Sequence, residues 1–354
     1  MIRISILRAS LLLLGIIAIS GCSTVGYLTH TTNGHLAVVT SKEPITDILA
    51  KGKYSAQQRE QLANVLRIRA FASDHIGLPD NKSYTEYVNL NRDYVTWSIF
   101  ATDELSLQPT TWCFWIVGCV PYRGYFSEEK AEGFAEKLRA SGHDVYVAPI
   151  PAYSTLGWFT DPLLSSMLRN GEIITAEYIF HELVHQQLYI KNDTNFNEAF
   201  ASAVARVAVI DWLQAEGNTE GVDRYRAAIR KRLELFSLTQ QLREELTSIY
   251  SSDSTDQQKR QQKRQAFQQH RERIYKLTEH WSNGEAYRNS VLRSLNNAKL
   301  NAQSTYNDLI PSFITLFDNC GKNYQRLYEV VASMEKLDKD QRLEYLSEGN
   351  CTEI

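Results

Sequence analysis

The sequence predicts an α+β protein that is predominantly helical, with a small sheet in its N-terminal half. Beyond Asp161, apolar residues recur almost throughout with the 3.6-residue period of amphipathic helices. Before it, aromatic and β-branched residues gather in two short runs that are typical of strands. The chain has 354 residues, 43% hydrophobic and 22% charged, which is an ordinary globular composition. Its net charge of −3 gives no reason to expect nucleic acid as a partner.

The first 21 residues are predicted to be an export signal that does not belong to the fold. Two arginines precede an apolar run, residues 11–19, which is too short for a membrane span. The following ISGC resembles the lipobox of bacterial lipoproteins, and this implies cleavage before Cys22 and lipidation of its thiol. Ser23 stands where that family has an aspartate for inner-membrane retention, which implies an outer-membrane lipoprotein facing the periplasm. An uncleaved anchor or a plain signal peptide is the alternative.

Export also determines how the remaining cysteines are interpreted. Four are left, an even number for an oxidising compartment: Cys113, Cys119, Cys320 and Cys351. Three pairings are possible, and 113–119 with 320–351 is favoured because the local pair closes most easily. A zinc site built from them is disfavoured, since there is no CxxC and no histidine at ligand spacing.

The first half of the mature chain alternates between helical and extended patterns. Ser55 caps a helix that extends to about residue 72, and Gly77-Leu78-Pro79 breaks it. A further helix is expected to start near Ser83. Strands are expected at 94–102, in the cysteine loop and at 144–153, and a helix beginning at Ser127 separates the last two.

The second half is predicted to be a series of helices. Their expected ranges are 176–190, 196–217 and 222–250. Residues 257–277 are rich in glutamine and basic side chains, and are best interpreted as a solvated helix face or loop.

HELVH, residues 181–185, carries the chemistry that the sequence suggests. On a helix, residues four apart share a face, so His181 and His185 can present imidazole nitrogens to one metal ion. Glu182 lies beside them as a base for water. Two buried histidines without a metal are the alternative.

Glu198 is the expected third ligand. A short loop of turn-forming residues, 192–195, leads into the next helix, so the two helices are expected to be antiparallel neighbours. The GxxH extension of the metzincins is excluded because Leu188 and Lys191 stand at its positions. A carboxylate that merely sits near a helix N-terminus is the alternative for Glu198. With one Zn²⁺ per chain, Glu182 would accept a proton from water during peptide hydrolysis.

HELVH followed by NE resembles the gluzincin metallopeptidases, although Ser202 replaces the aspartate of the thermolysin pattern. Several stretches together resemble a family of bacterial lipoproteins described as predicted zinc aminopeptidases: LRIRAFASDHIGLPDNKSYTEY, WCFWIVGCVPYRGYF, AYSTLGWFTDPLL, FHELVHQQLY, FNEAFAS and LNNAKL. This resemblance implies a gluzincin-like domain over residues 22–354. An α/β lobe is expected at about 29–160, and a helical lobe with the zinc site at 161–354.

Other site residues have weaker support in the sequence. Tyr153 and Tyr306 are the candidates for stabilising the oxyanion. Arg123 could contact a substrate carboxylate, but its aromatic neighbours favour packing.

The function expected from the sequence is a membrane-anchored zinc peptidase with a peptide substrate. Aminopeptidase action follows only from the family resemblance. The alternatives are an envelope endopeptidase and a non-catalytic lipoprotein whose zinc is structural.

Overall fold

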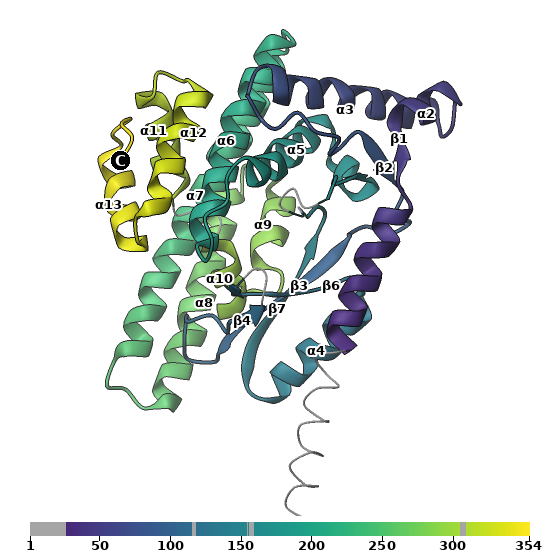
Figure 1. The fold of residues 1–354 in the computed structure, drawn as a ribbon. Coiled ribbons are helices and arrows are strands. Elements are labelled where there is room, and N and C mark those ends of the chain that lie inside the picture. Colours follow the sequence, from purple (N-terminus) through teal and green to yellow (C-terminus); the bar gives the residue numbers. More distant parts are fainter. Residues whose placement is uncertain (1–25, 115–117, 154, 156–158, 305–308) are drawn as a thin grey trace, which may run out of the picture.

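The computed structural model describes residues 26–114, 118–153, 155, 159–304 and 309–354 (Figure 1). Within them the chain is predominantly helical with small sheets, which confirms the α+β prediction. None of the helices in these ranges is long and apolar enough to cross a membrane.

The described strands form three small sheets. In the central sheet, β3 (Thr96–Asp103) lies between β6 (Arg123–Tyr125) and β7 (His143–Ile150), and it is antiparallel to both. Helix α4 (Glu128–Ala140) packs on this sheet through Ala131 and Ala135. The second sheet is a hairpin of β4 (Trp112–Phe114) and β5 (Gly118–Val120). The third has three strands, β1 (Glu43–Pro44), β2 (Glu86–Val88) and β8 (Leu163–Leu164).

Helices surround these sheets, beginning with the helix at residues 26–40. The next helices of the first half are α2 (Ile45–Ala50) and α3 (Ala56–Asp74). From residue 165 onward the described elements are η1 (Ser165–Asn170), α5 (Glu172–Gln187), α6 (Thr194–Ala215), α7 (Thr219–Ser251), α8 (Asp256–Thr278), α9 (Gly284–Leu292), α10 (Asn297–Ser304), α11 (Ile310–Asn319), α12 (Tyr324–Ser333), η2 (Met334–Lys336) and α13 (Lys339–Glu348). In Figure 1, α11, α12 and α13 gather on the side away from the helix at residues 26–40.

Both helix starts predicted from serine caps are present. The Ser55 hydroxyl accepts a hydrogen bond from the Gln58 amide, and the Gln58 side chain completes a capping box. Ser127 accepts from the Lys130 amide at the start of α4.

The helix expected near Ser83 is wrong, because the chain there makes a turn and then enters β2. Tyr84 adopts a left-handed backbone conformation with φ 64°. The guanidinium group of Arg69 donates to the carbonyl oxygens of Pro79, Asn81 and Ser83 and so holds this segment out of a helix.

The largest apolar core lies around α5 and α6. Ile179, Phe180 and Leu183 of α5 and Phe200 of α6 are completely buried in it. The same core includes Ile68 of α3, so residues from both halves of the chain share it.

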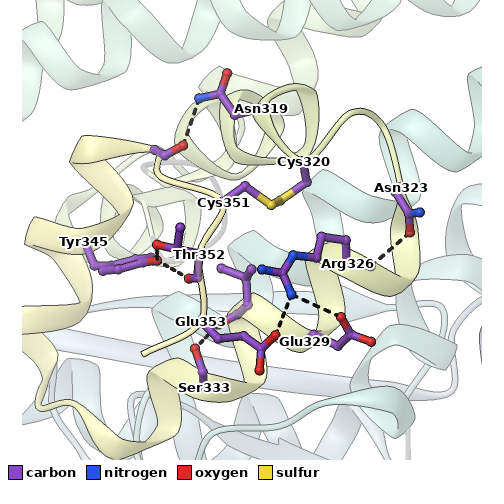
Figure 2. The surroundings of a disulfide bond; sticks show 12 residues. Asn319, Cys320, Asn323, Arg326, Glu329, Ser333, Tyr345, Cys351, Thr352 and Glu353 are labelled. Carbon is purple, nitrogen blue, oxygen red and sulfur yellow. Dashed lines mark hydrogen bonds and ion pairs between the residues drawn. A yellow bond between two sulfur atoms is a disulfide. The ribbon is translucent and has the colours of Figure 1, made fainter.

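Both predicted disulfides are confirmed. Cys113 is bonded to Cys119 across the hairpin, and Cys320 is bonded to Cys351. Figure 2 shows the second bond, which ties the segment after α13 to the end of α11. Nearby, the Asn319 side chain donates to the carbonyl oxygen of Gly349.

Replacing Cys320 and Cys351 together by serine is expected to lower the free energy of unfolding by about 3–4 kcal/mol, because this bond closes a loop of 31 residues. The Cys113 and Cys119 pair encloses only 6 residues, so its removal should cost about 2 kcal/mol. Denaturant unfolding of the two double variants under oxidising conditions measures both losses. An equal or smaller loss for the 320–351 pair would contradict this expectation.

Candidate metal centre

One face of helix α5 is polar, and its apolar face is buried against the core. Its apolar residues Phe180, Leu183 and Val184 have no exposed surface, so they fix the rotation of the helix against the core. His181 and His185 therefore project together on the remaining face. The helix ends at Gln187, because Leu188 is extended with φ −152°.

The turn between α5 and α6 is fixed by buried hydrogen bonds. The Asn197 side chain accepts from the Ile190 amide at 2.8 Å and donates to the Ile190 carbonyl at 2.7 Å. Asn192 takes the left-handed conformation that the reversal needs. Asp193 accepts two hydrogen bonds from the buried guanidinium of Arg342 on α13. These contacts place the first turn of α6, with Glu198, beside α5.

His181, His185 and Glu198 converge as the sequence predicted. The Nε2 atoms of the two histidines are 3.1 Å apart. The Glu198 carboxylate oxygens lie 3.2 Å from His181 Nε2 and 3.6 Å from His185 Nε2. One ligand atom from each residue falls within 4.8 Å of the other two. The side chains are only 7–19% exposed.

These three residues fit a single divalent metal ion. Two ligand atoms that each lie about 2.0–2.1 Å from a tetrahedral ion are about 3.3 Å apart, close to the spacings observed. Burial alone would raise the pKa of Glu198, but the charges and hydrogen bonds of His185 and His181 hold it well below its usual value, so the carboxylate is ionised. Two imidazoles and one carboxylate form a nitrogen–oxygen donor set that zinc accepts.

The outer nitrogens of the two histidines differ in their surroundings. His181 Nδ1 lies 3.4 Å from the Ser202 hydroxyl, one turn beyond Glu198 on α6. His185 Nδ1 is buried, and among the described residues it has no hydrogen-bond partner. Ser202 can therefore help to fix the orientation of the His181 ring.

Glu182 directly follows His181 on α5 and is shielded from water next to the cluster. Burial, together with the charges of Glu198 and Asp161, raises the pKa of Glu182 to about 7, although His181 acts in the opposite direction. A carboxylate with this pKa can both accept and release a proton near neutral pH.

Asp161 is a buried residue of this environment that the sequence did not single out. It is 2% exposed, and its carboxylate accepts hydrogen bonds from the amide and hydroxyl of Thr155 and from the Gln186 side chain. Gln186 is one turn after Glu182 on α5. Its bond to Asp161 therefore anchors the helix on the side that carries Glu182.

The two tyrosines proposed from the sequence have different outcomes. The hydroxyl of Tyr153 lies 3.0 Å from His35 Nδ1, in the helix at residues 26–40. Tyr153 also contributes to the raised pKa of Tyr84, so it borders the region next to Glu182. Tyr306 lies outside the described residues.

Three other tyrosines respond to the charges of Glu182 and Glu198, and sequence reasoning missed them. Burial raises the pKa of Tyr122 and of Tyr189, and in both the charge of Glu198 adds to the effect. Burial and then Glu182 raise the pKa of Tyr84, whose hydroxyl has no hydrogen-bond partner among the described residues. All three phenols stay protonated at neutral pH and can donate hydrogen bonds. Nothing in their local sequence distinguishes them from the other tyrosines.

Arg123 packs on aromatic rings, as its neighbours predicted. Its guanidinium lies 3.9 Å from the ring centre of Tyr27 and 4.5 Å from that of Phe134.

Comparison with known proteins adds one finding to this geometry. The sequence model of a family described as "Putative aminopeptidase" matches residues 26–346, which include His181, His185 and Glu198. No curated protein and no solved structure matches the chain. Because the family match covers most of the sequence, the chain belongs to the "Putative aminopeptidase" family.

Proposed function

We propose that the protein is a zinc-dependent aminopeptidase with a gluzincin-like site. The observation that carries the proposal is the convergence of His181, His185 and Glu198 beside Glu182, in a chain of the aminopeptidase family. A purely structural metal site would not need a carboxylate with a raised pKa next to its ligands.

The three clustered residues would hold the metal, and the surrounding groups would perform the proton transfers. When bound, zinc would supply Lewis-acid polarisation of a peptide carbonyl group and of water. Glu182 accepts a proton from the attacking water and returns it to the leaving amine. The charges of Glu182 and Glu198 act on the protonated phenols of Tyr84 and Tyr122, which makes these two tyrosines the candidates for donating to the negative charge on the carbonyl oxygen.

Paired peptide substrates test the aminopeptidase assignment. The zinc-loaded protein is expected to release the first residue of a peptide with a free amino terminus and to leave the same peptide intact when that terminus is acetylated. Mass spectrometry of the products identifies the bond that is cut. Internal cleavage of both peptides would instead support an envelope endopeptidase.

Ser202→Ala is expected to weaken zinc binding by about 10-fold, because His181 loses the hydroxyl that orients its ring. Competition with a chromophoric chelator measures the affinity. Ser237→Ala, at an exposed position on α7, is the matched control and should bind zinc like the wild type. Equal zinc affinities for all three proteins would show that Ser202 does not contribute to zinc binding.

We also propose that a lipid on Cys22 anchors the protein to the bacterial envelope, at the outer membrane facing the periplasm. In a bacterial host, the full chain is expected to fractionate with outer membranes and to gain the mass of several acyl chains at its N-terminus. Cys22→Ala should abolish both properties. A wild-type protein that is found without lipid would contradict the anchor.

A further inference from the structure

A buried ion pair attaches the start of α6, the helix that carries Glu198, to the C-terminal part of the chain. Asp193 is 8% exposed at the end of the α5–α6 turn, and Arg342 is 5% exposed on α13. The Nε and Nη2 atoms of Arg342 donate to the same Asp193 oxygen at 3.0 and 2.8 Å. Its Nη1 atom donates to the Leu337 carbonyl oxygen. All three guanidinium nitrogens are therefore used within the protein.

Asp193 is the N-cap residue of α6, but its carboxylate does not cap the helix. Its backbone carbonyl accepts the first helical hydrogen bond, from the Asn197 amide at 3.1 Å, whereas its side chain makes no capping bond within the described chain. An aspartate at this position ordinarily accepts from an amide in the first turn. Arg342 thus draws the carboxylate away from its own helix and toward α13, in a contact between residues 149 positions apart.

The C-terminal helices also contact the aromatic residues on both sides of Glu198 in the sequence. The guanidinium of Arg342 lies 5.7 Å from the ring centre of Phe196, within the range of a cation–π contact. Phe313 of α11 packs against Phe196 and Phe200, with ring centres 5.0 and 5.2 Å apart. The residues two before and two after Glu198 are therefore held by α11 and α13.

A metal site is sensitive to small displacements of this helix. Glu198 follows Asp193 by five residues, which is about 7.5 Å along the axis of α6. Metal–ligand distances in protein sites stay within about 0.2 Å of their standard values. A comparable shift at the start of α6 would therefore weaken the bond from Glu198, while the two histidines of α5 stayed in place.

We propose that Arg342 is a positioning residue for Glu198, and that through Asp193 it couples the docking of helix α13 to zinc binding. This inference rests on the proposed zinc site and specifies how its third ligand is held. Arg342 restrains the start of α6, so zinc binds most tightly while α13 is docked. By linkage, zinc stabilises the docked helix by the same factor.

Arg342→Ala is expected to bind zinc about 10-fold more weakly than the wild type, as is typical when a residue that supports a metal ligand is removed. Chelator competition measures the affinity. Helix α6 should persist, because the released Asp193 carboxylate can then cap it. Zinc affinity equal to that of the wild type would overturn the inference.

Lys299→Met is the matched control for this variant. Lys299 is another buried cation, 3% exposed, and its ammonium donates to the carbonyl oxygens of Ser290 and Arg293, which belong to neither α5 nor α6. The control should lose stability and still bind zinc like the wild type. An equal loss of zinc affinity in both variants would show that Arg342 acts only through general stability, and would overturn the inference.

Guanidinium ions are expected to restore the zinc affinity of Arg342→Ala. A cavity of about 410 Å³ borders Asp193 and Arg342, and the exposed Leu343 also lines it, so the ion can reach the carboxylate that the variant leaves without its partner. Guanidinium chloride well below denaturing concentrations should raise the affinity, and sodium chloride at the same concentration should not. An affinity that guanidinium leaves unchanged would contradict the positioning role.

Hydrogen exchange of the wild-type protein measures the coupling without any substitution. Saturating zinc is expected to slow the exchange of the α13 amides about 10-fold relative to those of α8, which report on global unfolding. In Arg342→Ala this selective effect should disappear. If zinc leaves the exchange of α13 in the wild type unchanged relative to α8, the inference is wrong.

These measurements follow zinc and not hydrolysis, so they separate the inference from the proposed function. A wild-type protein that binds zinc and shows the selective protection of α13, but cleaves no peptide, would support the coupling and contradict the peptidase. Peptide cleavage by the wild type, together with equal zinc affinities of the wild type and Arg342→Ala, would overturn the coupling alone.

Discussion

Replacing Glu182 by glutamine is expected to lower kcat by about 10²–10⁴ while zinc content and folding remain those of the wild type. The change removes the group that accepts a proton from water and keeps the shape of the side chain. Because Glu182 is not one of the three clustered metal-binding residues, the metal should remain bound. Steady-state kinetics and metal analysis of the same preparation measure the two properties together.

Glu244→Gln is the matched control for this prediction. Glu244 is exposed on α7, so its replacement should leave kcat unchanged. If Glu182→Gln retains the wild-type kcat, Glu182 does not transfer the proton, and the proposed mechanism is wrong. A loss of activity accompanied by a loss of zinc would point to a role in holding the site together.

Glu198→Ala is expected to weaken zinc binding by at least about 100-fold and to abolish hydrolysis. Removing a direct ligand should cost more than removing an outer-shell partner, for which losses of about 10–100-fold are typical. The variant also removes the carboxylate that lies 3.2–3.6 Å from both histidines. Chelator competition measures the affinity, and circular dichroism checks that α6 remains folded.

Glu216→Ala provides the control on the same helix, since Glu216 is exposed at the C-terminal end of α6. It should bind zinc like the wild type. If Glu198→Ala binds zinc with wild-type affinity, Glu198 is not a ligand, and the two histidines are the only ligands that the account retains.

The sequence was sufficient to predict the helical hairpin that forms the candidate metal centre. The histidines four residues apart identified one face of α5, and the turn-forming residues 192–195 indicated where the chain reverses. Both signals are local, because helical period and turn preference depend on residues close in sequence. The contact that fixes this turn from outside, between Asp193 and Arg342, joins residues 149 positions apart and could not be anticipated.

The features that the sequence did not predict also depend on contacts between residues far apart in the chain. The segment around Ser83 has an acceptable helix start, but Arg69 occupies its carbonyl groups, and that contact becomes visible only in the folded chain. Asp161 and Tyr84 come from loops and lie beside Glu182 only after folding. Residues 257–277 do form a largely exposed helix face on α8, as expected, although Lys263 binds the Asp144 carboxylate of β7.

Metal analysis of the purified full-length protein tests the central claim most directly. Elemental analysis after exhaustive dialysis against metal-free buffer is predicted to find one zinc ion per chain, and to find none in a His181→Ala, His185→Ala double variant. Substantially less than one zinc per wild-type chain, or the same amount in the double variant, would contradict the account.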